Sequence, residues 1–173
     1  MGIYAEDLRE FIIRPTLILL DDWSEGVENL LVGTAAQESQ LGYRMQVSNE
    51  TGLGIYRISA RTHLEVWDKY LVTDPESASR VRGLASQQQF LKSPHNELVS
   101  NLSYSTAIAW MIYKRHELNI PDCFNNTELA KLWATYYCHR DGQSHHIEST
   151  SSRVEQFIDS YKKCVCAKKP LAA

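Results

Sequence analysis

The 173-residue chain has few of the features that mark a metal-binding, membrane or secreted protein. Its four cysteines form no CxxC pair and no Cys–His spacing typical of zinc, so free thiols in a reducing compartment are the simplest interpretation. No apolar run is long enough to span a bilayer, and Glu6, Asp7 and Glu10 interrupt the place where the apolar part of a signal peptide would lie. We therefore expect no metal, no cofactor, no membrane insertion and no cleaved signal.

The chain also lacks a strong excess of charge of either sign. Lys and Arg number 18 and Asp and Glu number 21, which gives a net charge of −3 and argues against nucleic acid as a partner. The length suits one domain with a sizeable core. Four lysines near the end, Lys162, Lys163, Lys168 and Lys169, indicate a solvated tail. We expect one domain over residues 1–162 and a Lys- and Cys-containing tail over residues 163–173.

Hydrophobic periodicity predicts six or seven helices and hence a mostly α fold. The first covers residues 4–13 and is expected to end at Arg14-Pro15, because proline disfavours helix in the residue before it. Ser24 is expected to cap a helix that runs to about Gln40. Later helices are expected to begin after Ser59, at Asp74-Pro75, after Ser93-Pro94 and at Thr127. Residues 43–58 break the helical pattern and predict a short irregular β-hairpin or loop.

Glu38 lies on the apolar side of the helix that Ser24 begins. Steps of three and four residues from Val27 reach Leu30, Leu31, Thr34, Glu38 and Leu41. Partial burial and the C-terminal end of the helix dipole both disfavour a carboxylate, so we expect a raised pKa, which suits a general acid. The alternative is a boundary residue whose carboxylate reaches water or pairs with an arginine such as Arg44.

Short motifs around Glu38 give the sequence a family resemblance. Glu38-Ser39, followed by Gly54-Ile55-Tyr56-Arg57-Ile58, resembles the Glu-Ser and Gly-Leu-Met-Gln-Ile signatures of goose-type lysozymes and soluble lytic transglycosylases. Residues 33–39, together with Gly54-Ile55-Tyr56, Thr62-His63 through Trp67, and Tyr70-Leu71, look closer still to small transglycosylase-like proteins of tailed phages. That closer resemblance extends from Tyr4 to about Tyr161, and it depends on the order and spacing of the motifs together.

The resemblance implies a lysozyme-like α fold and cleavage of peptidoglycan between N-acetylmuramic acid and N-acetylglucosamine. Glu38 matches the catalytic acid, and Ser39 matches the residue that supports it. Gly54, Ile55, Tyr56 and Arg57 match the segment that lines the glycan groove. Tyr104 lies on the helix expected behind the acid. Tyr136 and Tyr137, followed by Cys138, stand at the family's Tyr-Asn motif, where a tyrosine reaches toward the acid.

Two positions depart from the family pattern. Arg57 replaces the usual glutamine and Cys138 replaces the usual asparagine. Arg57 could hydrogen-bond a sugar, or it could pair with Glu38 and lower its pKa. Glu50 is the best candidate for a second carboxylate, although a solvated turn residue is the simpler interpretation. His145-His146 is interpreted as an exposed loop rather than a metal site.

These observations predict a phage enzyme that degrades peptidoglycan, is assembled in the host cytoplasm, is carried in the virion and acts on the host cell wall. Expected partners are bacterial peptidoglycan and other virion proteins. The alternative is a virion structural protein that keeps a lysozyme-like fold without turnover, which Arg57 and Cys138 favour. A third interpretation is an endolysin released through a holin.

Overall fold

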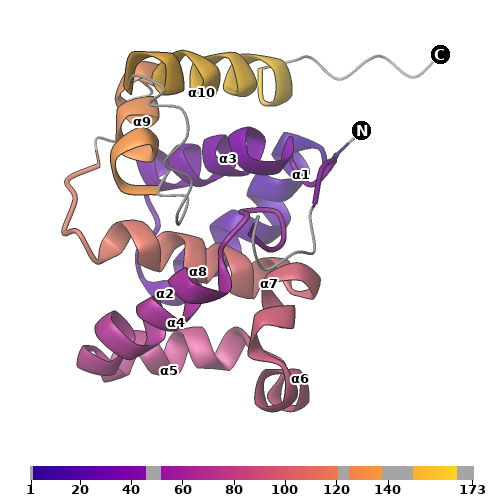
Figure 1. Ribbon diagram of the computed structural model, residues 1–173, viewed down its shortest axis with the longest axis vertical. Coiled ribbons are helices and arrows are strands. Elements are labelled where there is room, and N and C mark those ends of the chain that lie inside the picture. The colour runs from indigo at the N-terminus through magenta and orange to yellow at the C-terminus, as the bar shows by residue number, and fades with distance from the viewer. Residues whose placement is uncertain (1, 46–51, 121–124, 138–149, 167–173) are drawn as a thin grey trace.

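The computed structural model describes residues 2–45, 52–120, 125–137 and 150–166. These residues are mostly helical, which confirms the predicted mostly α class (Figure 1). The one β interaction among them is an isolated antiparallel bridge between Leu53 and Ile58. The predicted hairpin is thus represented, in the described residues, by a single bridged turn over residues 53–58. Among the described residues, no helix combines the length and apolar character needed to cross a bilayer.

The N-terminal helical run is longer than the sequence predicts. It passes without a break through α1 (Ala5–Leu8), the π-helical η1 (Arg9–Ile13) and α2 (Arg14–Leu20). The predicted end at Arg14-Pro15 is therefore wrong. Pro15 lies in the first turn of the α segment that follows the wider π turn, where a missing backbone N–H is tolerated. The run ends instead at Asp21, whose φ is 62°.

Helix α3 (Glu25–Ser39) packs against the N-terminal helical run and against the C-terminal helix of residues 150–164 (Figure 1). Ser24 caps it as predicted, because its Oγ accepts a 3.2 Å hydrogen bond from the Val27 N–H. Most residues of α3 are buried, including both apolar and small side chains. The helix ends where Gln40 takes a left-handed conformation with φ of 53°, so the chain reverses direction immediately after Glu38 and Ser39.

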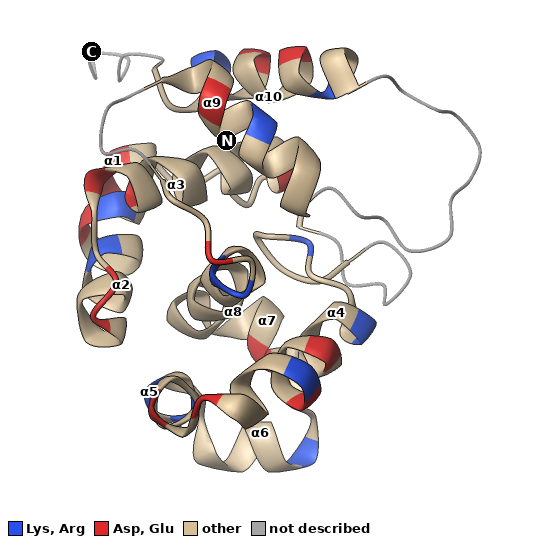
Figure 2. Ribbon diagram, turned by 90° about the vertical axis from the view of Figure 1, so that its left-hand side faces the viewer, with Lys and Arg blue, Asp and Glu red and all other residues tan. Residues whose placement is uncertain are grey.

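Most of the remaining helices pack against α3 or against the helix of residues 102–114. In chain order they are α4 (Ala60–Glu65), the π-helical η2 (Val66–Tyr70), the 3₁₀ turn η3 (Leu71–Thr73), α5 (Pro75–Leu84), α6 (Gln87–Lys92), the 3₁₀ turn η4 (Pro94–Asn96), α7 (Glu97–Ser100), α8 (Leu102–Lys114), α9 (Asn126–Leu132), the π-helical η5 (Trp133–Tyr137) and α10 (Thr150–Cys164). Residues of both charge signs are interspersed along these helices (Figure 2).

Several predicted helix starts are confirmed and others shift. Ser59 caps α4 and Asp74 caps α5 with their side-chain oxygens. The long helix expected after Ser93-Pro94 is divided, because Asn101 leaves the helical conformation and caps α8. Asn125 rather than Thr127 caps α9, through bonds from the N–H groups of residues 127 and 128 to its side chain.

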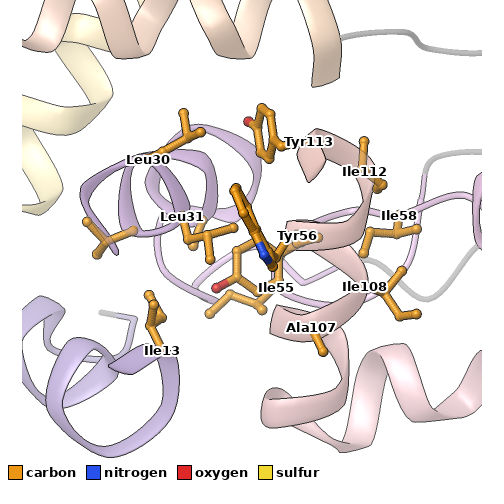
Figure 3. Packing of buried hydrophobic residues seen from close by; sticks show 14 of the residues in the cluster. Ile13, Leu30, Leu31, Ile55, Tyr56, Ile58, Ala107, Ile108, Ile112 and Tyr113 are labelled. Atoms are coloured by element: carbon orange, nitrogen blue, oxygen red, sulfur yellow. The ribbon is translucent and has the colours of Figure 1, made fainter. Parts of the chain in front are cut away.

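The bridged turn packs into the centre of the core between α3 and α8. Ile55 and Tyr56 are fully buried there, beside Leu31 of α3 and Ile108 of α8 (Figure 3). Helix α10 covers another side of α3 at Gly33, where a Cβ would collide with the rings of Phe157 and Tyr161. A segment without regular structure thus lies inside the molecule, directly beside the end of α3.

Candidate active site

Glu38 lies in the last turn of α3 and is half-buried. Its Oε1 accepts a hydrogen bond of 2.9 Å from Nε1 of Trp133, the first residue of η5. Trp133 is only 3% exposed, and its ring packs against that of Phe157 with 5.7 Å between centroids. The indole is therefore fixed by the core, and it fixes one oxygen of the carboxylate in turn.

Two hydrogen bonds attach the bridged turn to the elements that surround Glu38. The Ser39 hydroxyl donates to the Ile55 carbonyl at 2.7 Å and accepts from the Gly42 N–H at 2.8 Å. The Tyr137 hydroxyl donates to the Tyr56 carbonyl at 2.9 Å. Ser39 thus acts on the backbone beside Glu38, whereas the family resemblance implied support of the glutamate itself. Successive carbonyls of the turn are held from α3 and from η5.

Tyr137 is also electrostatically linked to Glu38. Burial raises the pKa of its hydroxyl well above the ordinary value, and the negative charge of Glu38 adds to that effect. Its ring stacks on Tyr113 with 5.2 Å between centroids. The hydroxyl therefore keeps its proton and remains a donor. Trp133 and Tyr137 are the two ends of one π-helical segment, a conformation frequent at functional sites.

Gly54 and Arg57 form the tight part of the bridged turn in left-handed conformations. Gly54 has φ of 70°, and a Cβ at this position would collide with the Leu98 carbonyl oxygen, so only glycine fits. Arg57 has φ of 48° and donates from Nη2 to the Arg44 carbonyl at 3.2 Å. Its buried Nε has no hydrogen-bond partner in the part of the chain that the structure describes. Ion pairs between described residues include neither Glu38–Arg57 nor Glu38–Arg44.

The other residues expected at the glycan groove lie deeper or elsewhere. The side chains of Ile55 and Tyr56 are fully buried, and the Tyr56 hydroxyl accepts from Thr106 at 3.1 Å. Since both residues are 0% exposed, neither their side chains nor their backbone atoms reach the surface. Tyr104 is fully buried too, with its hydroxyl bonded to His63 and Trp67. Tyr136 is half-buried against the His116 ring. The candidates Cys138, Glu50 and His145-His146 lie outside the described residues.

Trp133 is the site residue that sequence reasoning did not single out. Its spacing with Leu129, Leu132 and Tyr136 indicates a buried helical position, but that pattern fits any core tryptophan. Nothing in the sequence pairs an indole with a carboxylate 95 positions earlier. The contact depends on how α9 and η5 pack against the end of α3.

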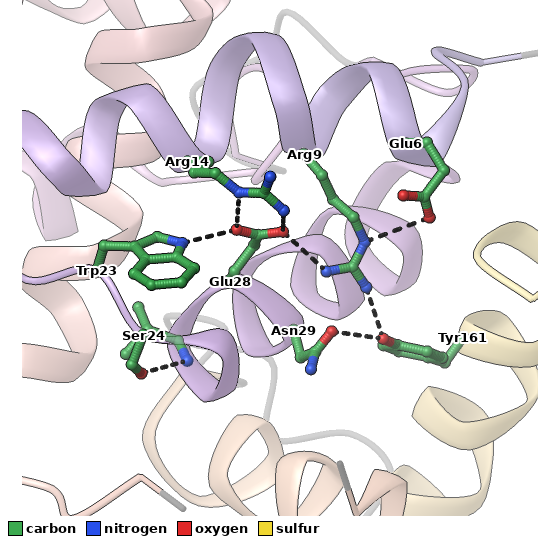
Figure 4. Close-up of polar contacts among 9 residues, drawn as sticks. Glu6, Arg9, Arg14, Trp23, Ser24, Glu28, Asn29 and Tyr161 are labelled. Atoms are coloured by element: carbon green, nitrogen blue, oxygen red, sulfur yellow. Dashed lines mark hydrogen bonds and ion pairs between the residues drawn. The ribbon is translucent and has the colours of Figure 1, made fainter. Parts of the chain in front are cut away.

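A second polar cluster lies at the other end of α3 (Figure 4). Glu28, with a side chain 4% exposed, accepts two bonds of 2.9 Å from Arg14, one of 2.8 Å from Trp23 and one of 3.4 Å from Arg9. Burial opposes ionisation, but the hydrogen bonds from Arg14 and Trp23 and the arginine charges outweigh it, so the pKa of Glu28 is lowered. Arg9 also donates to Tyr161 of α10 at 2.9 Å.

This second cluster borders an open pocket of about 450 Å³, lined by Glu6, Arg9, Arg14, Trp23, Glu25, Glu28 and Asn29. The carboxylate oxygens of Glu28 already accept four hydrogen bonds, and its charge is balanced by the two arginines. The arrangement joins the N-terminal helical run, α3 and α10. We interpret it as a structural ion-pair cluster rather than a catalytic site.

Comparison of the chain with protein-family models, curated proteins and solved structures finds no match. In the part of the chain that the structure describes, no three His, Cys, Asp or Glu side chains gather closely enough to hold a metal ion. The candidate site consists of Glu38, Trp133, Tyr137 and the bridged turn.

Proposed function

We propose that the protein is a glycan-cleaving enzyme of the lysozyme or lytic transglycosylase type, acting on bacterial peptidoglycan with Glu38 as the acid and base. The position of Glu38 is the main support for this proposal. Its carboxylate stands at the end of the mostly buried helix α3, is oriented by a buried indole and lies beside a backbone turn held from both sides. General-acid cleavage needs one carboxyl group in a fixed orientation at the edge of the core.

In the proposed reaction, protonated Glu38 donates its proton to the oxygen of the leaving sugar as the glycosidic bond breaks. The resulting carboxylate then takes a proton from the C6 hydroxyl of the muramic residue, which closes a 1,6-anhydro ring. In a lysozyme it takes that proton from water instead. Trp133 restricts rotation of the carboxylate during both steps, and the buried turn holds the end of α3 in place behind it.

Two buried polar atoms lie on the elements that form this site. Among the described residues, Oε1 of Gln37, the neighbour of Glu38 in α3, has no hydrogen-bond partner, and Nε of Arg57 on the bridged turn has none either. Buried polar atoms in folded proteins are nearly always bonded. Because both atoms are inaccessible to solvent, a sugar would meet them only after the turn or the end of α3 moves.

The biological setting is proposed from the sequence motifs alone. Their order and spacing suggest a tailed-phage protein that is assembled in the host cytoplasm, is carried with other virion proteins and opens the host wall. The holin-dependent endolysin would use the same site chemistry, so it differs in delivery rather than in mechanism.

A virion structural protein without turnover is the second candidate function. The observation that favours it is Arg57, which stands at a position where the resembling enzymes have glutamine and whose guanidinium bonds to the Arg44 carbonyl. The complete burial of the Ile55 and Tyr56 side chains also favours a structural protein, because these side chains cannot contact a glycan.

The deciding experiment is incubation of the purified protein with peptidoglycan sacculi of several wall types, followed by mass analysis of the released muropeptides. We expect anhydro-muramic or reducing-end products from the wild type and none from Glu38→Gln. Glu25→Gln, an exposed change in the first turn of the same helix, is the matched control and should retain activity. Folding of each variant is checked by circular dichroism. No products from the wild type on any wall would favour the structural protein.

A further inference from the structure

A chain of hydrogen bonds connects four elements, η2, α8, α4 and η4. Nε1 of Trp67 in η2 donates to the Tyr104 hydroxyl of α8 at 2.9 Å. That hydroxyl lies 2.6 Å from Nε2 of His63 in α4, and Nδ1 of His63 lies 2.9 Å from Nδ1 of His95 in η4. His63 is 1% exposed and Tyr104 is fully buried, whereas His95 is half-buried.

The positions of the hydrogens in this chain follow from the donors available. Trp67 can only donate, so the Tyr104 oxygen accepts from it and the Tyr104 hydrogen points to Nε2 of His63. Neutral His63 then has its hydrogen on Nδ1, which donates to Nδ1 of His95. This arrangement of hydrogens is the one in which each of these groups has a hydrogen-bond partner, and it requires both imidazoles to be neutral.

An added proton disrupts this arrangement of hydrogen bonds, whichever of the two imidazoles it binds. A doubly protonated His63 donates from Nε2 to the Tyr104 oxygen, so the Tyr104 hydrogen loses its acceptor. A doubly protonated His95 donates to Nδ1 of His63, which moves the His63 hydrogen to Nε2 with the same result. A buried hydroxyl without an acceptor is costly. The less costly response is for the charged His95, which already reaches the surface, to separate from His63.

The charges around the pair do not compensate for an added proton. Arg82 of α5 lies over the Phe90 ring, which contacts both Trp67 and Tyr104. The carboxylate of Glu97 in α7 already accepts hydrogen bonds from the Ser86 N–H and the Asn101 side-chain amide. On α4 itself, Arg61 and Glu65 pair with each other, and Lys92 of α6 is exposed. Burial, and then the neighbouring His95, lower the pKa of His63 to about 4.

The pair is linked to the candidate active site through contacts of the backbone. His95 in η4 directly precedes α7, and the Leu98 carbonyl of α7 packs against Gly54. The bridged turn that contains Gly54 is attached to Ser39, the neighbour of Glu38, through the Ile55 carbonyl. A shift of η4 and α7 therefore changes the surface on which the turn rests.

We propose that the His63–His95 contact is an acid-sensitive latch, which holds η4 and α7 in place at neutral pH and releases them when an imidazole is protonated. Release loosens the bridged turn beside Glu38. The structural part of this proposal is independent of the reaction, whereas its effect on turnover rests on the proposed function.

The test is hydrogen exchange of the full chain followed by mass spectrometry at pH 7 and pH 5, corrected for the intrinsic pH dependence of exchange. When the pH falls from 7 to 5, we expect the exchange rate of residues 86–101 to rise about tenfold more than that of α10. Acid favours the open form, because a released imidazole binds a proton more readily than a buried one. His95→Asn keeps a polar side chain but cannot titrate in this range, so its response should be smaller than that of the wild type. The combined variant His63→Asn/His95→Asn, which has neither imidazole, should respond less than about twofold. His116→Asn, on an exposed histidine outside the latch, should respond like the wild type.

An equal acid response in His95→Asn and the wild type would overturn the latch, as would the absence of any selective response in the wild type. Muropeptide release at the two pH values gives a separate result. If the wild type releases no muropeptides at either pH while residues 86–101 still open selectively, the proposed function fails and the latch stands.

Discussion

Nε1 of Trp133 lies 2.9 Å from Oε1 of Glu38, and this contact joins the two regions on which the candidate site depends. Glu38 belongs to the mostly buried helix α3, and Trp133 begins the π-helical segment that also positions Tyr137. An N–H fixed by the core restricts the carboxylate more strongly than water would, because the indole cannot reorient without disturbing its packing against Phe157. The contact therefore provides a direct way to test whether orientation of Glu38 matters.

Trp133→Phe should reduce peptidoglycan cleavage by about tenfold, because one hydrogen bond to a charged group contributes roughly 1.5–3 kcal/mol and orients the acid. Loss of a donor to the carboxylate favours its protonated form, so the pH profile of cleavage should also move to higher pH. The measurement is muropeptide release as a function of pH. Trp23→Phe removes a similar indole bond, to Glu28, and should leave that profile in place. The same profile for both variants would contradict an orienting role for Trp133.

Gly54→Ala should destabilise the fold by about 2–4 kcal/mol, because the new Cβ combines an unfavourable left-handed conformation with a collision against the Leu98 carbonyl. Gly83→Ala is the matched control. Nothing lies within 4 Å of a Cβ at Gly83, which is exposed in α5, so alanine should stabilise the protein by roughly 0.5–1 kcal/mol. Urea unfolding of both variants measures the difference. A Gly54→Ala variant as stable as the wild type would show that the turn can move away from α7.

Glu28→Gln should reduce the free energy of unfolding by about 3 kcal/mol, because it leaves the buried Arg9 with only its longer ion pair to the exposed Glu6 and removes the counter-charge of Arg14. Glu25→Gln, exposed one turn earlier, should change it by less than about 0.5 kcal/mol. Urea unfolding at neutral pH provides the comparison. A Glu28 variant that loses no more stability than the Glu25 control would contradict a structural role for the cluster.

The same carboxylate gives the wild type a defined response to acid. The pKa of Glu28 is lowered in the folded state, so its contribution is fully present above the unfolded value of 4.5. That contribution is lost as the pH falls through the lower, folded value. Unfolding free energies measured from pH 7 to pH 3 should therefore fall more steeply for the wild type than for Glu28→Gln. Parallel curves would mean that Glu28 does not titrate differently in the two states.

The sequence by itself determined the helical class, the helix that contains Glu38 and several of its boundaries. Apolar residues at spacings of three and four specify a helix that buries one side, and Ser24, Ser59 and Asp74 cap helices through bonds to N–H groups three residues later. These interactions are local, so they can be predicted without knowing where the chain folds back. The extension of the first helix through Pro15 was missed because a π turn has no simple sequence pattern.

Only the tertiary structure decided what surrounds Glu38. The indole of Trp133, the attachment of the turn by Ser39 and Tyr137, and the burial of Tyr104 against His63 all join residues that lie 16 to 95 positions apart. Such contacts depend on how helices pack, and many side chains of similar size and polarity satisfy the same hydrophobic pattern. Periodicity therefore indicates that Glu38 faces the core, whereas the packing of η5 and the bridged turn determines which groups meet it there.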